Sequence, residues 1–182
     1  MRIVLAITGA SGLQYGVRLH QVLRELGHDV WVVHGSGAKT VSEAEGVEIP
    51  GADFGEKEMG APPASGSHPV DGMVVAPCSL KTLGEISNGI GSNLVARSAE
   101  VMLKERRKLV LVVRETPLSY IAIKNMEKVT LAGGVVLPAC PGFYSKPQTV
   151  EEIVDFVCGK TLDQLGIRHK LYKRWKSPHD LK

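Results

Sequence analysis

Short apolar runs alternate with amphipathic segments along most of the chain. The apolar runs are rich in β-branched residues and are bounded by charge or by turn residues; they are Ile3–Ile7, Val30–Val33, Met73–Ala76, Leu109–Val113 and Gly134–Leu137. Short runs without polar alternation are typical of strands buried on both faces of a parallel sheet. We therefore expect five such strands.

The segments between these runs carry helical periodicity. Gly27 predicts the end of the first helix, and Thr149 with Glu152 three residues later predicts the start of the last one. A further helix is predicted over Asn93–Arg107. Two stretches show apolar residues at i, i+3, i+4 and i+7: Leu19, Val22, Leu23 and Leu26, and later Val150, Ile153, Val154 and Val157.

Strands that alternate with helices imply right-handed crossovers and a parallel sheet. We predict a single α/β domain over residues 1–182, a Rossmann- or flavodoxin-like three-layer arrangement. Residues 46–69 are rich in Gly, Pro and Ser and predict a long irregular connection, which is usually functional or mobile. The basic tail, residues 166–182, contains Tyr172 and Trp175 and is expected to pack on a neighbouring subunit.

Composition narrows the classes of function. The formal charge of +3 suits an anionic ligand and does not indicate nucleic-acid binding. No apolar stretch approaches the roughly 20 residues of a membrane span, and no cleavable leader is recognisable. The three cysteines have no metal-like spacing, so we expect a reduced, cytoplasmic setting and no metal site.

Polar and glycine residues follow the predicted strands at their carboxyl ends, where open α/β sheets bind their ligands. The turn Thr8-Gly9-Ala10-Ser11-Gly12 lets backbone approach a ligand and presents a helix start to an anion. It lacks the GxGxxG spacing, and His34-Gly35-Ser36-Gly37 stands where a dinucleotide site needs a carboxylate. A mononucleotide phosphate therefore fits better than a dinucleotide.

The third strand ends in Ala76-Pro77-Cys78-Ser79, followed by Leu80-Lys81-Thr82. Ser79 predicts an N-cap, and Thr82 predicts a hydroxyl in the first turn. Cys78 is interpreted as a buried small residue rather than a nucleophile, because no motif sets a histidine beside it.

The fourth run leads into Arg114-Glu115, which offers a guanidinium fork for an anion and a carboxyl that can carry a proton. Arg97 and Lys104 are seven residues apart on the predicted helix and therefore share a face, from which both can reach one anion. Tyr144, after the fifth run, supplies a hydroxyl or a ring.

The residues suited to phosphate exceed what one phosphate needs. We infer two phosphate-bearing ligands, or one cofactor and one anionic substrate. The residues are Ser11, Ser36, Ser79, Thr82, Arg114 and Lys160.

These motifs, in this order, resemble the flavin prenyltransferases of the UbiX type, within the wider family of homo-oligomeric flavin-containing decarboxylase-like proteins. The resemblance covers about residues 3–175. It is carried by Thr8–Gly12, by the loop Ala61–Ser67 (Ala-Pro-Pro-Ala-Ser-Gly-Ser), by Leu103–Arg107 with Arg114–Pro117, and by Pro141–Tyr144.

The resemblance implies that reduced FMN accepts a dimethylallyl group from dimethylallyl phosphate at N5 and C6, in a metal-independent reaction. The prenylated FMN would serve a UbiD-type decarboxylase, and the chain would assemble into a homo-oligomer, by analogy a dodecamer. The flavin would be held by Gly9, Ala10, Ser11, Ser36, Ser79, Leu80, Lys81, Thr82 and Arg114.

The same resemblance assigns the substrate and the chemistry. Tyr144 and Lys160 would bind the prenyl phosphate, with Arg97, Lys104 and Glu115 near it and Trp175 approaching from the tail. The catalytic residues implied are Lys104, Glu115, Glu45, Ser11 and Arg97.

One position departs from the pattern, because some relatives carry a Trp before the Ala61–Ser67 loop where this chain has Met59-Gly60. Two other functions stay open at this point. One is a flavin-dependent decarboxylase of a cysteine or phosphopantothenoylcysteine substrate, although that class uses a Pro-x-Met-Asn-x-x-Met loop. The other is a carrier that binds FMN without catalysis.

Overall fold

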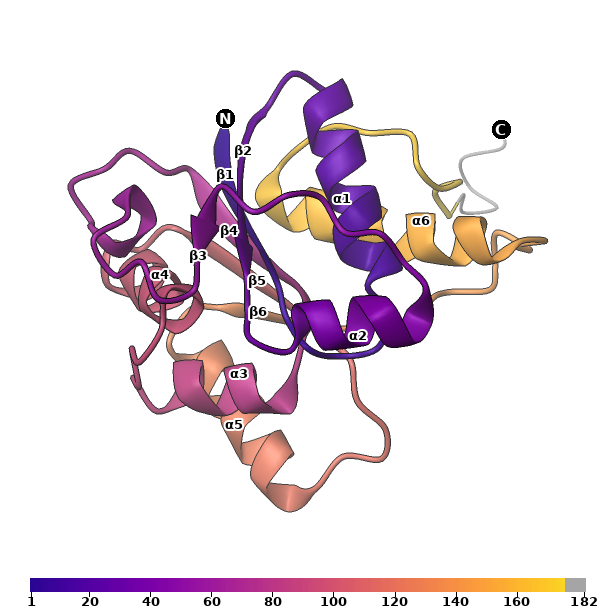
Figure 1. Ribbon diagram of the computed structural model, residues 1–182. Helices are drawn as coiled ribbons and strands as arrows, with labels where there is room; N and C mark the ends of the chain where they lie inside the picture. Colours follow the sequence, from indigo (N-terminus) through magenta and orange to yellow (C-terminus); the bar gives the residue numbers. More distant parts are fainter. Residues whose placement is uncertain (176–182) are drawn as a thin grey trace.

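The computed structural model describes residues 1–175, which form one parallel sheet between two layers of helices (Figure 1). The sheet order is β3-β2-β1-β4-β5-β6. If the two-residue β3 is set aside, this is the flavodoxin-like order; with it, the order is that of a Rossmann sheet. The strands are β1 (Arg2–Ile7), β2 (Asp29–His34), β3 (Phe54–Gly55), β4 (Gly72–Cys78), β5 (Lys108–Val113) and β6 (Val135–Pro138).

All five predicted runs are strands, and their ends lie within two residues of expectation. The strand β5 shows why its run is continuously apolar. Val110 and Val112 pack on one side of the sheet, while Leu109 and Leu111 pack on the other. Both faces are therefore buried, as the pattern predicted.

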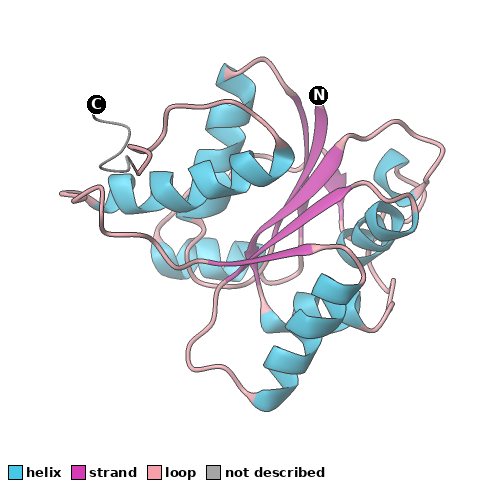
Figure 2. Ribbon diagram, turned by 180° about the vertical axis from the view of Figure 1, so that it is seen from behind, coloured by secondary structure: helices cyan, strands magenta, loops and turns pink. Residues whose placement is uncertain are grey.

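Each face of the sheet is covered by three helices (Figure 2). One face carries α1 (Gln14–Glu25), α2 (Ala38–Glu45) and α6 (Val150–Leu165). The opposite face carries α3 (Leu80–Ser87), α4 (Leu94–Lys104) and α5 (Tyr120–Leu131).

The helix ends follow local chemistry that the sequence predicted only in part. Gly27 has a φ of 77°, and the His28 N–H reaches the Leu23 carbonyl at 3.0 Å, which ends α1 as expected. Leu26 is 43% exposed rather than buried, because it lies at this helix end. The α4 helix ends at Lys104 rather than Arg107, because Arg106 adopts a φ of 56° and β5 begins two residues later.

The last helix begins where predicted. The Thr149 hydroxyl accepts a hydrogen bond from the Glu152 N–H at 3.2 Å. Its buried face starts later than the pattern suggested: Val150 is 65% exposed, whereas Val154, Val157 and Leu162 lie in the core. Within residues 46–69 only β3 and a 3₁₀ turn at Pro62–Ala64 are regular, in agreement with the predicted irregular connection.

One helix presents apolar side chains to the outside. On and just before α5, Leu118, Tyr120, Ile121 and Leu131 are 42%, 75%, 71% and 81% exposed. We call these four residues the α5 face. Clusters of exposed apolar side chains of this kind mark surfaces that bind another molecule.

The tail folds back along α6 of its own chain as far as Trp175, while residues 176–182, on which part of the expected subunit contact falls, lie outside the described residues. None of the helices in the described part of the chain is long and apolar enough to cross a membrane.

Candidate functional site

The loops after β1, β2 and β4 meet at the carboxyl edge of the sheet, where the strand order reverses direction. Thr8 joins two of these loops. Its hydroxyl donates to the Pro77 carbonyl at 2.7 Å and accepts from the Ser79 N–H at 2.9 Å, and the residue is 2% exposed. This hydroxyl fixes the start of α3 against the end of β1.

Glycines bring the other two loops into contact. A Cβ on Gly9 would lie 2.7 Å from the Gly37 Cα, and a Cβ on Gly37 would lie 2.9 Å from the Gly9 Cα. Neither position tolerates a side chain without movement of the backbone. Gly9 was among the predicted site residues, whereas Thr8 and Gly37 were not, although the Gly-Ser-Gly spacing after β2 is the signal that could have identified Gly37.

A cavity of about 170 Å³ opens at this junction. Its lining combines hydroxyl groups, glycine backbone, and acidic and amide side chains. The lining residues are Thr8, Gly9, Gly35, Ser36, Gly37, Glu56, Ser79, Lys81, Thr82, Glu85, Asn93 and Val95. The structure thus gathers the predicted residues Gly9, Ser36, Ser79, Lys81 and Thr82 around one space.

The α3 helix begins at this cavity. Ser79 caps it, because its hydroxyl oxygen accepts a hydrogen bond from the Thr82 N–H at 3.3 Å, as predicted. The Ser79 hydroxyl also donates to the Thr82 hydroxyl at 3.1 Å. Lys81 lies in the first turn and forms an ion pair with Glu85 at 3.3 Å. The partial positive charge of a helix start favours an anion here.

The start of α1, by contrast, already holds a carboxylate. Glu45 accepts hydrogen bonds from the Gly12 N–H at 2.8 Å and the Leu13 N–H at 3.2 Å. Burial raises the pKa of Glu45, but the hydrogen bonds from Ser11 and from these two amides, with the charge of Arg114, outweigh it and the pKa is lowered. Ser11, Glu45 and Arg114 therefore form one cluster beside the turn after β1.

Arg97 and Lys104 lie under the Ala61–Ser67 loop. The Arg97 Nε donates to the Ala64 carbonyl at 3.2 Å, and its Nη1 contacts Glu100 at 2.8 Å. Lys104 pairs with Glu105, and a Cβ on Gly66 would lie 2.7 Å from the Lys104 Nζ. The two cations thus share one face, as their spacing predicted.

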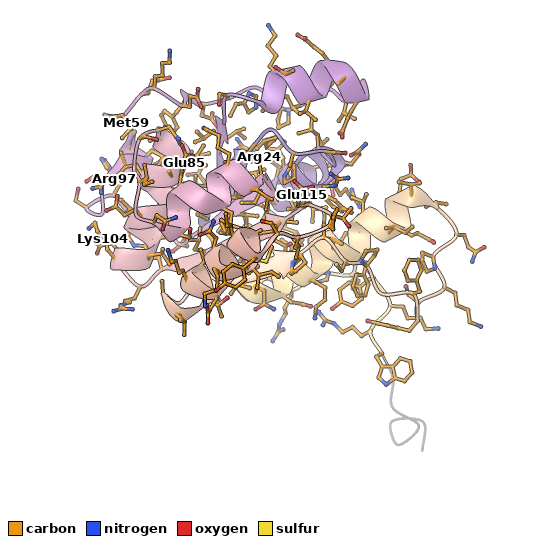
Figure 3. The ribbon with its side chains drawn as sticks, turned by 90° about the horizontal axis from the view of Figure 1, so that it is seen from below. Arg24, Met59, Glu85, Arg97, Lys104 and Glu115 are labelled. Carbon is orange, nitrogen blue, oxygen red and sulfur yellow. The ribbon has the colours of Figure 1, made fainter. Side chains whose placement is uncertain are left out.

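The structure does not bring Lys104 and Glu115 together within one chain. Figure 3 shows Arg97 and Lys104 at one side of the molecule and Glu115 well away from them. The Glu115 carboxylate is exposed and accepts the Thr116 N–H at 3.0 Å.

Tyr144 packs against α6, the helix that carries Lys160. The Tyr144 ring packs edge-on against Phe156 with centroids 5.8 Å apart, and against Trp175 at 5.5 Å. Phe156 and Lys160 are four residues apart on α6 and therefore share a face. The predicted substrate residues Tyr144, Lys160 and Trp175 are thus gathered in one region.

The buried cysteine at the end of β4 is not part of this chemistry. Cys78 is fully buried, and burial raises its pKa to about 12. The thiolate that a nucleophile needs is therefore scarce at neutral pH, which agrees with the interpretation of Cys78 as a core residue. Among residues 1–175, no group of three His, Cys, Asp or Glu side chains is placed to hold a metal ion.

Comparison with known proteins gives concordant results. Residues 1–162 match the family described as Flavoprotein. The flavin prenyltransferase UbiX of Aquifex aeolicus is 47% identical over 190 residues, covering 96% of this chain and 98% of that protein.

Two crystal structures extend the similarity to the fold. AnUbiX (PadA1), in complex with FMN and dimethylallyl pyrophosphate, superimposes with a TM-score of 0.93 at 42% identity, over 97% of each chain. A dodecameric FMN-dependent UbiX-like decarboxylase from Escherichia coli O157:H7 gives a TM-score of 0.90 at 41% identity, over 97% of this chain and 100% of that one.

Proposed function

The chain belongs to the flavoprotein family and is a flavin prenyltransferase that uses FMN, and we propose how its own residues divide this work. The observation that carries the proposal is the arrangement at the sheet edge. A hydroxyl-lined cavity lies beside the α3 start, and the cations Arg97 and Lys104 lie outside its lining, under the Ala61–Ser67 loop.

We assign the FMN phosphate to the cavity at the α3 start. The hydroxyls of Ser36, Ser79 and Thr82 line it, and the contact of Gly9 with Gly37 leaves backbone rather than side chains at its wall. The α1 start is the weaker candidate, because the Glu45 carboxylate already accepts the two N–H groups just before the helix, those of Gly12 and Leu13. A second anion there would be repelled.

The other flavin contacts are assigned to the cluster beside the turn after β1. Ser11 and Arg114 both lie close to Glu45. Ala10 lies in the tight turn after β1, and its N–H donates to the Thr8 carbonyl at 2.9 Å. When bound and reduced, FMN supplies the nucleophilic N5 and C6 positions.

Lys104, Arg97 and Glu115 act on the prenyl donor. Its allylic C–O bond breaks with the electron pair going to the phosphate oxygen, and the guanidinium and ammonium groups stabilise the charge that develops there. Glu115 is assigned to give that phosphate a proton. Tyr144 and Lys160 bind the phosphate before the bond breaks.

The proton lost from the ring carbon needs an acceptor. Glu45 is a weak one, because its hydrogen bonds hold its pKa below the usual range. The departed phosphate has a second pKa well above that of a carboxyl group and is the better base at neutral pH. We therefore assign Glu45 to holding the α1 start and orienting Ser11.

Lys104 and Glu115 must meet between copies of the chain if both act on one phosphate. Three observations support this arrangement. The two residues lie apart in one chain (Figure 3), the cavity of about 170 Å³ is smaller than a complete ligand site, and the α5 face beside Glu115 is apolar and exposed. We propose that a neighbouring copy supplies Arg97 and Lys104 to the site that Glu115 completes, in a homo-oligomer that, like the E. coli relative, is a dodecamer.

Mixed oligomers test this proposal. Lys104→Ala and Glu115→Ala chains, each expected to be inactive alone, are co-expressed with different tags and purified as mixed assemblies. With reduced FMN and dimethylallyl phosphate under anaerobic conditions, some sites in a mixed assembly contain an intact pair. We expect prenylated flavin, detected by its mass, at a substantial fraction of the unmutated rate.

The control is a mixed assembly of unmutated chains with chains that carry both substitutions. It measures the activity that mixing mutated and unmutated chains gives without complementation between the two single variants. Each single variant should bind FMN with unchanged affinity. Mixed assemblies that are as inactive as the single variants would mean that Lys104 and Glu115 act within one chain or not on one phosphate. An unchanged rate in either single variant would refute its role.

The two other functions have less support. A cysteine decarboxylase of this fold uses a different loop from the Ala61–Ser67 loop, which here contacts Arg97 and Lys104. A carrier needs neither Lys104 nor Glu115, so release of unmodified flavin from the unmutated protein would favour it. We further propose that the product serves a UbiD-type decarboxylase and that the chain acts in the cytoplasm, where its free cysteines stay reduced.

A further inference from the structure

One carboxylate on α6 binds three residues of the tail. The Asp163 carboxylate accepts a hydrogen bond from the Tyr172 hydroxyl at 2.6 Å and from the Arg174 Nη2 at 2.7 Å. The His169 Nε2 lies 3.1 Å from Asp163 Oδ1, the oxygen that Arg174 also contacts. We call this group the Asp163 clamp.

The clamp is a fitted arrangement rather than a loose surface contact. The His169 side chain is 2% exposed, and that of Asp163 is 19% exposed. A Cβ on Gly159 would lie 2.5 Å from Tyr172 and 2.6 Å from His169, so the tail lies directly on the α6 backbone. Despite its burial, hydrogen bonds from Arg174, Tyr172 and His169 lower the pKa of Asp163 to about 2, so the carboxylate is charged at neutral pH.

The clamp lies at one end of a row of aromatic rings. Tyr172 packs against Phe156 at 5.0 Å, Phe156 against Tyr144 at 5.8 Å, and Tyr144 against Trp175 at 5.5 Å. Trp175 follows Arg174 directly, so holding Arg174 holds Trp175 against the Tyr144 ring. The position of Tyr144, which is on a loop, therefore depends on the tail as well as on α6.

The clamp also affects Lys160. The Lys160 Nζ lies 3.9 Å from Asp163 Oδ2, a long ion pair, while the same oxygen receives the Tyr172 hydroxyl at the much shorter 2.6 Å. Because the tail donors satisfy the carboxylate, Lys160 is left free to turn to an incoming phosphate. Without them, Asp163 would bind Lys160 more closely.

We propose that Asp163 is a positioning residue for the prenyl-phosphate site: it fixes the tail so that Trp175 holds Tyr144, and it leaves Lys160 available. This inference rests on the proposed function, in which Tyr144 and Lys160 bind the phosphate of the donor. Asp163 itself touches neither flavin nor donor.

The test is Asp163→Asn in a Trp31→Phe background, so that Trp175 is the one remaining tryptophan. Loss of a charged acceptor for three donors should raise the KM for dimethylallyl phosphate about tenfold. The kcat at saturating donor and the Kd for FMN should stay near the values of the Trp31→Phe protein. In protein without flavin, the fluorescence anisotropy of Trp175 should fall, because the ring moves more freely once it loses its contact with Tyr144.

Two variants make the outcome specific. Asp155→Asn changes a carboxylate on the same helix that binds Arg18 at 2.6 Å and not the tail, so it should leave both the KM and the Trp175 anisotropy unchanged. Asp163→Glu keeps the charge and should restore part of the KM. An unchanged anisotropy in Asp163→Asn, or a fall in anisotropy with unchanged KM, would overturn the proposal.

Tyr144→Phe separates this inference from the proposed function. If Tyr144→Phe leaves the KM for the donor unchanged, the assignment of Tyr144 to the phosphate fails. If Tyr144→Phe raises the KM and Asp163→Asn does not, the phosphate site stands and the positioning role of Asp163 is wrong.

Discussion

The hydroxyl of Thr8 accepts a hydrogen bond from the backbone N–H of Ser79 at 2.9 Å, which joins the end of β1 to the start of α3 across 71 positions of sequence. The same hydroxyl donates to the Pro77 carbonyl. One side chain therefore satisfies two backbone groups and sets the opening of the cavity assigned to the FMN phosphate.

Thr8→Val should lower both stability and flavin affinity. The substitution keeps the shape but leaves the Ser79 N–H and the Pro77 carbonyl without a partner, at a cost of about 1–3 kcal/mol in the free energy of unfolding. Urea unfolding measures the stability, and quenching of flavin fluorescence measures the FMN Kd. Thr8→Ser keeps the hydroxyl and should recover most of both; equal effects of the two variants would contradict this role.

Gly37→Ala should weaken FMN binding because its methyl group would meet the Gly9 backbone at 2.9 Å, closer than carbon atoms approach. Backbone movement there costs about 1–3 kcal/mol and displaces the loop that carries Ser36. Titration with FMN should show a Kd raised by an order of magnitude or more. Gly51→Ala is the matched control, since no atom lies within 4 Å of its Cβ position; a similar loss in that variant would point to a general effect.

The Asp163 clamp should appear in the pH dependence of stability. The pKa of Asp163 is about 2 in the folded chain against 3.8 as its ordinary value. A lowered pKa contributes stability that is fully present above about pH 4 and is lost as the pH falls toward 2. Urea unfolding from pH 6 to pH 2 should therefore show a steeper decline for the unmutated protein than for Asp163→Asn, and parallel curves would exclude a stabilising charge there.

The three cysteines should differ sharply in reactivity. Burial raises the pKa of Cys78 to about 12 and raises that of Cys158 as well, whereas Cys140 is exposed. A thiol reagent at pH 8 should modify one cysteine rapidly in the native protein and three in denaturant. Mass spectrometry of peptides should locate the fast modification at Cys140. Rapid modification of Cys78 would require the end of β4 to open.

The sheet was predictable because its strands are buried on both faces, so that runs such as Leu109–Val113 contain no polar position. The caps of α3 and α6 were predictable for a different reason, since Ser79 and Thr149 act on amides three residues away. The α5 helix has apolar residues on its exposed side as well as on its buried side. The periodicity of its apolar residues therefore does not indicate which side packs on the sheet.

The sequence predicted which loops form the site, but not which side chains contact one another there. Strand ends must meet at one edge, so Ser36 and Ser79 were expected to come together, and both line the cavity. The partners of Glu45 were not predictable, because its contact with Gly12 crosses 33 positions and depends on where the end of α2 lies relative to the turn after β1. The separation of Lys104 from Glu115 depends on tertiary placement, which helical spacing does not encode.

The exposed α5 face bears on how the activity of the enzyme changes when the protein is diluted. If neighbouring copies cover Tyr120 and Ile121 and complete each site, a separated chain keeps its sheet and its flavin cavity but loses the groups that activate the donor. Turnover per chain would then fall at low protein concentration while flavin binding persists. Catalysis would then require the assembled oligomer, and the concentration of the chain would itself regulate the activity.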